Sequence, residues 1–281
     1  MDTTVLVTGP TGNVGAPLVR ILSEQGVSIQ AGVHSGIGRL GEVPTVPLDF
    51  RKPETFVGAL SGVEQVFLVR PPAISDIGNT LGPFIEQAEA MGVRHIVFLS
   101  LLGAEANPVV PHARVESSLM EADLDVTLLR ASFFMQNLST THRREIRDRG
   151  EIIVPAGDGR TSFVDCRDLA AAAARALTDP SVTCRAYDCT GPAALSYHEV
   201  AAIMTDVLDR PIRYTNPSLL RFAWHAYQEG HPWIKIVVMG AIYTTARLGW
   251  AARVTDDLNR LLTRPPYTMR EFVESHASSW A

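Results

Sequence analysis

A glycine-spaced segment near the start of the chain constrains the fold more than any other feature. Residues 8–15 read Thr-Gly-Pro-Thr-Gly-Asn-Val-Gly, after a β-rich apolar run over 4–8 and before a helical pattern over 14–25. These glycines let the backbone turn tightly, and the helix start directs N–H groups and its positive dipole end at the turn. An ordinary turn is the alternative, but the strand–turn–helix context favours a pyrophosphate-binding loop of the Rossmann type. We assign this loop to Gly9, Thr11, Gly12, Asn13, Val14 and Gly15.

The first half of the chain continues as alternating short strands and helices, which is the pattern of a parallel sheet with crossover helices. Further strands are predicted over 28–33, 45–48, 65–69, 93–100 and 126–130, and helices over 53–60, 79–91 and 111–122. We expect Asn79 to cap the second of these three helices. Because such crossover connections are right-handed, the sequence predicts a doubly wound, parallel-sheet α/β fold.

The second half of the chain is less regular. Strands are predicted over 152–154, 162–164, 187–190 and 212–215, and an alanine-rich helix over 168–177. A helix over 196–208 begins with a capping box of Ser196 and Glu199, and the remainder is mostly helical. We therefore predict a dinucleotide-binding Rossmann domain over 1–150, to which the chain returns around 160–190. A smaller, mostly helical lobe over 151–281 is expected to bind the substrate.

Charge and apolar content limit the class of partner. The 281 residues carry a formal net charge of −5, without the basic excess of a nucleic-acid binder. The apolar stretch 234–248 is interrupted by polar residues and is too short to span a bilayer. The start lacks a signal-peptide pattern, and the three cysteines lack CxxC spacing. We expect a cytoplasmic monomer or homodimer that acts on a small molecule and has no nucleic-acid, membrane or metal partner.

The residues after the second predicted strand bear on the choice of cofactor. An acidic side chain there binds the 2′-hydroxyl of NAD, whereas cationic groups accommodate the 2′-phosphate of NADP. The chain has His34, Ser35 and Arg39 in this stretch and no carboxylate before Glu42. These three residues favour NADP(H), although a solvated loop and NAD(H) both remain open.

Further candidate contacts follow the next strands of the predicted sheet. Ligands of such folds bind where the parallel strands end. Asp49 and Phe50 are placed to accept from and to flank an adenine, and Val69, Arg70 and Pro71 to run beside a ribose. Ser100 ends the strand that follows. Each of these residues could instead serve a turn or a helix cap.

Several longer segments carry a resemblance to a known family. They are 8–15, 98–104 (FLSLLGA), 112–116 (HARVE), 127–137 (TLLRASFFMQN), 155–159 (PAGDG), 164–168 (VDCRD) and 190–192 (TGP). In this order they resemble the NmrA-like group of atypical short-chain dehydrogenases, over nearly the whole chain. That group includes NADPH-dependent quinone oxidoreductases, triphenylmethane-dye reductases and redox sensors. The resemblance adds Phe133, in the fourth segment, to the expected cofactor contacts.

The chain departs from the resemblance at two positions. Members often carry arginine where this chain has His34. The Tyr-x-x-x-Lys pair of ordinary short-chain dehydrogenases would fall on Pro108 and His112, so its phenolic acid is missing. His112 lies four residues before Glu116 on one helical face, where it could bind ribose or donate a proton. We take His112 and Ser100 as the candidate catalytic residues, with a structural histidine as the alternative.

The missing acid favours one class of reaction. Reduction of a simple ketone builds alkoxide charge and requires a strong acid, whereas a quinone spreads the incoming charge over its π system. We therefore predict an NAD(P)H-dependent reductase that transfers hydride to a flat, electron-poor, conjugated acceptor such as a quinone. A non-catalytic NADP(H)-sensing regulatory protein is the first alternative. A biosynthetic tailoring enzyme that performs a cyclisation or dehydration on the same scaffold is the second.

Overall fold

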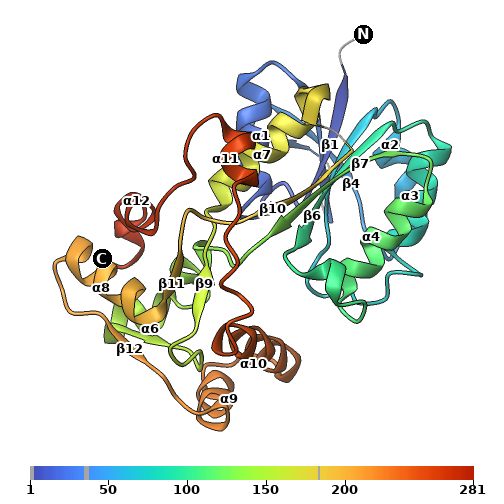
Figure 1. The fold of residues 1–281 in the computed structure, drawn as a ribbon. Helices are drawn as coiled ribbons and strands as arrows, with labels where there is room; N and C mark the ends of the chain where they lie inside the picture. Colours follow the sequence, from blue (N-terminus) through green and yellow to red (C-terminus); the bar gives the residue numbers. More distant parts are fainter. Residues whose placement is uncertain (1–2, 35–37, 183) are drawn as a thin grey trace. The chain divides into compact units, whose positions relative to one another are not determined.

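The computed structural model describes residues 3–34, 38–182 and 184–281. The chain forms two compact units, each of which is built from several segments. The first unit comprises Met1–Ala131, Cys166–Cys189 and Asp257–Arg264, and the second comprises Ser132–Asp165, Thr190–Asp256 and Pro265–Ala281 (Figure 1). Residues 132–150 thus lie in the second unit, whereas the sequence-based division at residue 150 assigned them to the first.

The first unit is organised around one eight-stranded sheet. Its strands are β1 (Thr4–Thr8), β2 (Ser28–Val33), β3 (Arg39–Leu40), β4 (Val43–Pro47), β5 (Gln65–Val69), β6 (His95–Leu101), β7 (Asp125–Ala131) and β10 (Ala186–Cys189). Their order is β10-β7-β6-β5-β1-β2-β4-β3, with parallel pairing throughout except between β3 and β4. The order reverses at β1, so the doubly wound Rossmann fold is confirmed.

Two local predictions in this unit are corrected by the structure. The strand predicted over 45–48 begins two residues earlier, because Arg39–Leu40 pairs back on it as a hairpin around Gly41, whose φ is +62°. Asn79 does not cap α3. Its side chain donates to the Asp76 carboxylate at 2.8 Å, and Thr80 occupies the cap position without a side-chain cap.

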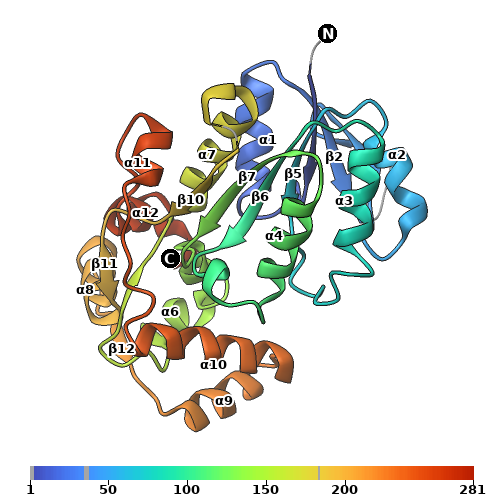
Figure 2. The ribbon, with the colours of Figure 1, turned by 45° about the vertical axis from the view of Figure 1, so that its right-hand side comes forward.

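Helices cover both faces of this sheet. They are α1 (Gly15–Glu24), α2 (Phe56–Leu60), α3 (Leu81–Ala90), α4 (Pro111–Glu121), α7 (Cys166–Thr178) and α11 (Asp257–Leu262). Figures 1 and 2 show α2, α3 and α4 on one face and α1, α7 and α11 on the other. Under α2 to α4 the core includes Phe56 and Phe84, whose rings meet edge to face. Such burial of apolar surface is what holds crossover helices on a sheet.

The second unit is mostly helical and has its own core. Its elements are α5 (Gln136–Ser139), α6 (Arg143–Arg149), β8 (Glu151–Ile153), β9 (Arg160–Ser162), β11 (Ala194–Ser196), α8 (Tyr197–Leu208), β12 (Arg213–Thr215), α9 (Leu219–Gln228), α10 (Trp233–Arg247) and α12 (Met269–Ser275). The capping box at α8 is confirmed, since Ser196 and Glu199 bond each other's backbone N–H groups. Within the described ranges, every helix falls short of the length and apolarity that a membrane span requires.

Candidate functional site

The predicted glycine loop joins β1 to α1 as a tight turn. Gly9 has a φ of +60°, and its carbonyl oxygen accepts from the N–H of Gly12 at 3.0 Å. A Cβ on Gly15 would lie 2.1 Å from that same oxygen, so this position excludes every side chain. The sequence spacing therefore serves a real steric requirement: the helix start approaches the preceding turn more closely than alanine allows.

The loop also leaves its outer surface accessible to a ligand. Thr11, Gly12 and Asn13 are exposed, while Val14 is buried and anchors the loop. The first turn of α1 carries no acidic residue, and among the described residues no side chain caps its N-terminus. A helix end of this kind attracts an anion through its N–H groups and dipole. The residues present therefore fit a dinucleotide pyrophosphate.

Strand β5 brings the predicted ribose segment next to this loop. The hydroxyl of Thr8 accepts from the Val69 N–H at 2.8 Å, and a Cβ on Gly9 would contact the Val69 side chain at 3.8 Å. Arg70 then folds over its own loop and donates to the carbonyl oxygens of Pro71 and Ile74. Burial lowers the pKa of Arg70, and its Nε finds no partner among the described residues.

The residues predicted to contact the adenosine lie after β2, in β3 and after β4, and their surroundings differ. The imidazole of His34 is mostly exposed and lies 3.7 Å from the Asp49 carboxylate. Arg39 instead contacts Glu42, and Ser35 lies outside the described residues. Phe50 packs into the core, with its ring edge-on to Phe84 at 5.1 Å between centroids. The structure thus brings His34 and Asp49 together, and the adenine contact of Phe50 stays a prediction.

Ser100 belongs to a buried polar network at the carboxyl edge. Its hydroxyl donates to Glu116 at 2.5 Å, and Arg130 donates to both carboxylate oxygens of Glu116 at 3.1 and 2.6 Å. Ser100 and Glu116 are only 4% and 7% exposed. Because its proton is directed to Glu116, the Ser100 oxygen is left to accept a hydrogen bond rather than to donate one.

Arg130 is absent from the predicted site residues, and Glu116 enters there only as a neighbour of His112. Arg130 is the penultimate residue of β7, the strand that pairs with β6, and it lies directly opposite Ser100 in the register. An arginine directly after the apolar pair Leu128 and Leu129, near the strand end at the same edge as Ser100, is the sequence signal that points to it. The sequence does not show which residue pairs with Arg130. In the structure that residue is Glu116, on α4.

His112 is held in an uncharged state. Burial, followed by the nearby positive charge of Arg70, lowers the pKa of His112 to about 4. Its ring lies beside Phe98, with centroids 6.1 Å apart. At neutral pH the imidazole therefore offers one donor and one acceptor, and it is not an imidazolium acid.

Phe133, the remaining predicted contact, lies in the second unit. Its ring packs edge-on against Phe163 at 5.7 Å and is tilted against Tyr243 at 6.0 Å. These contacts make Phe133 part of the aromatic core of that unit. Its contact with a cofactor stays a prediction.

Comparison with known proteins gives one consistent family. The sequence profile of the NmrA-like family matches residues 1–222. The NAD(P)H azoreductase of Xenophilus azovorans is 34% identical over 285 residues, covering 98% of this chain and 99% of the relative. The crystal structure of an NADPH-dependent quinone oxidoreductase from Escherichia coli superposes with a TM-score of 0.83 at 25% identity, covering 98% of this chain and 99% of that one.

The triphenylmethane reductase of Citrobacter sp. superposes with a TM-score of 0.87 at 22% identity, covering 98% of this chain and 99% of that one. It shares the fold. From the profile match and the full-length azoreductase similarity together, the chain belongs to the NmrA-like family.

Proposed function

We propose that this protein is an NAD(P)H-dependent reductase that transfers hydride to a flat, electron-poor, conjugated acceptor such as a quinone. The observation that carries the proposal is the 34% identity, over nearly the full length of both chains, with an NAD(P)H azoreductase. The glycine loop supports it, because its geometry suits a dinucleotide. Azo compounds and quinones share an extended π system that can take up a hydride and delocalise the charge.

The cofactor we propose is NADP(H), with NAD(H) as the second possibility. The loop from Gly9 to Gly15 would hold the pyrophosphate, and the segment from Val69 to Pro71 would lie beside it. His34 is exposed and free to turn toward a 2′-phosphate, although the neighbouring Asp49 carboxylate opposes a second negative charge there. When bound, the reduced nicotinamide supplies the hydride.

The residues at the carboxyl edge suit an acceptor that needs no strong acid. The Ser100 proton is directed to Glu116, and His112 is uncharged at neutral pH. Neither group resembles the acid that an alkoxide product would need. A reduced quinone can take its proton from water, so that positioning of the two reactants supplies most of the rate.

Turnover with a panel of acceptors tests the proposal. The protein with saturating NADPH is mixed with quinones, azo compounds and simple ketones, and loss of NADPH absorbance is followed. We expect turnover with conjugated acceptors and none with the ketones. If no conjugated acceptor gives turnover above background, the reductase proposal fails.

Alanine variants test the two candidate catalytic residues. Where the neutral His112 imidazole donates a hydrogen bond to the reacting acceptor, or Ser100 helps to hold that acceptor in place, loss of the residue should lower kcat on the order of 10²-fold. Where either residue holds only ribose, its loss should raise the Kd of the cofactor and leave kcat at saturation nearly unchanged. Ser118→Ala, on the same helix as His112, is the matched control. Wild-type kcat and Kd in both variants would show that the active site lies elsewhere.

The lack of a strong acid at Ser100 and His112 also favours a second candidate, an NADP(H)-sensing protein without catalysis. Such a protein must bind the oxidised and reduced cofactor with different affinities, since equal affinities transmit no signal. Titration calorimetry with NADP⁺ and NADPH measures this directly. Unequal affinities, together with the absence of turnover, would favour the sensor over the reductase.

A further inference from the structure

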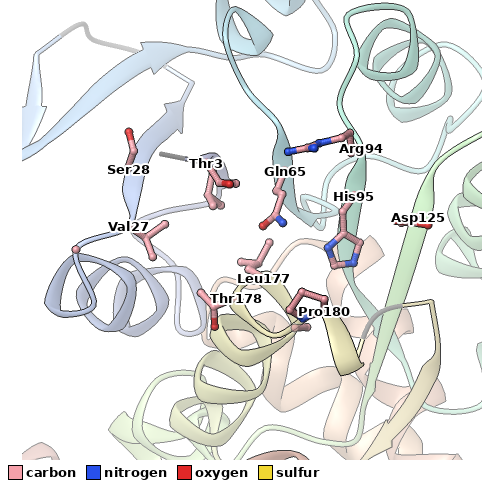
Figure 3. A pocket seen from close by; sticks show the side chains of 13 residues that line it. Thr3, Val27, Ser28, Gln65, Arg94, His95, Asp125, Leu177, Thr178 and Pro180 are labelled. Carbon is pink, nitrogen blue, oxygen red and sulfur yellow. The ribbon is translucent and has the colours of Figure 1, made fainter. Parts of the chain in front are cut away.

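A cavity lies at the edge of the sheet where its parallel strands begin, opposite the edge that carries the glycine loop and within the first unit. Its volume is about 520 Å³. Residues at or next to the starts of five parallel strands line it, namely Thr3, Ser28, Gln65, His95 and Asp125. Figure 3 shows these side chains around the opening. A volume of this size is in the range of small-molecule sites.

The remaining wall comes from the carboxyl ends of two helices. Gly26 and Val27 follow α1, and Leu177 and Thr178 end α7. In Figure 3 the Val27 and Leu177 side chains point into the cavity. Both helices therefore present the negative end of their dipole on this side, which disfavours an anion.

Two polar side chains in the wall have unused hydrogen-bonding capacity. His95 is only 3% exposed; its Nε2 lies 2.9 Å from the Thr127 hydroxyl, and its Nδ1 has no partner among the described residues. The side-chain oxygen of Gln65 likewise finds no partner in the described ranges. Figure 3 shows both side chains directed toward the cavity. Unpaired buried polar atoms are unfavourable. Both atoms are closed to water in this conformation, so a molecule in the cavity pairs with them once the two side chains turn toward it.

The charged groups at this edge leave the interior without a net positive charge. Burial lowers the pKa of His95, against the opposing effect of Asp125, so the imidazole is uncharged at neutral pH. Arg94 is mostly exposed at the rim and forms an ion pair with Glu64. Neither residue offers a buried cation to a carboxylate or a phosphate.

We propose that this cavity is a second ligand site for an uncharged, planar heterocycle or amide that carries neighbouring hydrogen-bond donors and acceptors. After a turn of the two side chains, its donors and acceptors would pair with the Gln65 amide and the His95 imidazole. The flat ring would lie on the apolar side chains of Val27 and Leu177. The site is separate from the dinucleotide loop and does not depend on the proposed reductase activity.

Uracil and its carboxylated analogue orotate are suitable probes. The protein is first saturated with NADP⁺, so that the dinucleotide loop is filled, and each probe is then titrated while ¹H–¹⁵N NMR spectra are recorded. We expect saturable shifts from uracil at the amides of Ser28, Gln65 and His95, and at least tenfold weaker binding of orotate. The absence of saturable uracil binding, or equal binding of the two probes, would overturn the proposal.

Two valine variants locate the site. Val27→Trp fills the cavity from a half-buried position, and Val57→Trp makes the same change on an exposed surface of α2, away from it. We expect the first variant to weaken uracil binding at least tenfold and the second to leave it unchanged. Unchanged NADP⁺ affinity in both verifies that the fold is intact. Equal uracil affinity in the two variants would place any binding outside this cavity.

Discussion

Gly15 is the residue at which backbone geometry and binding meet. A Cβ there would lie 2.1 Å from the Gly9 oxygen, so Gly15→Ala must push the start of α1 away from the loop. We expect a loss of a few kcal/mol in the free energy of unfolding and at least a tenfold rise in the Kd of NADPH. Gly58→Ala is the matched control, since its Cβ meets nothing within 4 Å. Urea unfolding and calorimetry measure both effects; equal behaviour of the two variants would contradict the steric argument.

His112 makes stability depend on pH in a defined window. Its pKa is about 4 in the folded protein and 6.5 as the ordinary value, so the unfolded chain binds its proton first as the pH falls. The free energy of unfolding should therefore decrease between pH 6.5 and 4, by about 3 kcal/mol at most from this one group. His112→Gln should remove that part of the slope. Urea midpoints of the wild-type protein and the variant, measured across this pH range, test the prediction. Parallel pH profiles for the two proteins would contradict it.

At the scale of elements, the Glu116–Arg130 pair joins α4 to β7 and, through Ser100, to β6. The hydrogen bond with Glu116 raises the pKa of Arg130, so the two charges stabilise each other. Glu116→Ala removes both hydrogen bonds to the Glu116 carboxylate but leaves Arg130 the Glu105 carboxylate at 3.5 Å, and it should cost about 2 kcal/mol. Glu24→Ala breaks the exposed Arg20–Glu24 pair and should cost about 0.5 kcal/mol or less. Comparable losses in urea unfolding would show that burial adds nothing to the inner pair.

At the scale of the whole molecule, the chain path predicts coupled unfolding of the two units. The chain passes between them after residues 131, 165, 189, 256 and 264, so neither unit is one continuous segment. All four tryptophans, Trp224, Trp233, Trp250 and Trp280, lie in the second unit. We expect tryptophan fluorescence and far-UV circular dichroism to report one coincident urea transition. A single transition is typical when neither part can fold alone.

Binding of the cofactor gives a second test of the coupled unfolding of the two units. NADP⁺ at about 100 times its Kd should stabilise the folded chain by about 2.7 kcal/mol. Because the glycine loop lies in the first unit, a shift seen by the tryptophans of the second unit would measure the coupling. The Gly15→Ala variant is the control, since it should lose this stabilisation. A fluorescence transition that NADP⁺ leaves unmoved would show that the units unfold independently.

Local features of the backbone, such as tight turns and helix caps, can be predicted from this sequence. The glycine spacing at 9, 12 and 15 predicts a turn that excludes side chains, and the Ser196–Glu199 spacing predicts a helix cap. Both act within a few residues, and the structure contains both. Alternating apolar strands and helices likewise predict the doubly wound sheet, because crossover handedness leaves few other arrangements.

The pairing of distant polar groups and the burial of particular apolar groups depend on tertiary contacts, which no local pattern predicts. Glu116 meets Arg130 and Ser100 because α4 packs beside β6 and β7, and no local pattern selects that partner. Phe50 enters the core beside Phe84, and His112 loses its charge because burial and Arg70 act on it. The physical reason is range: backbone sterics and caps act over a few residues, whereas burial and charge pairing depend on segments that meet only after the chain has folded.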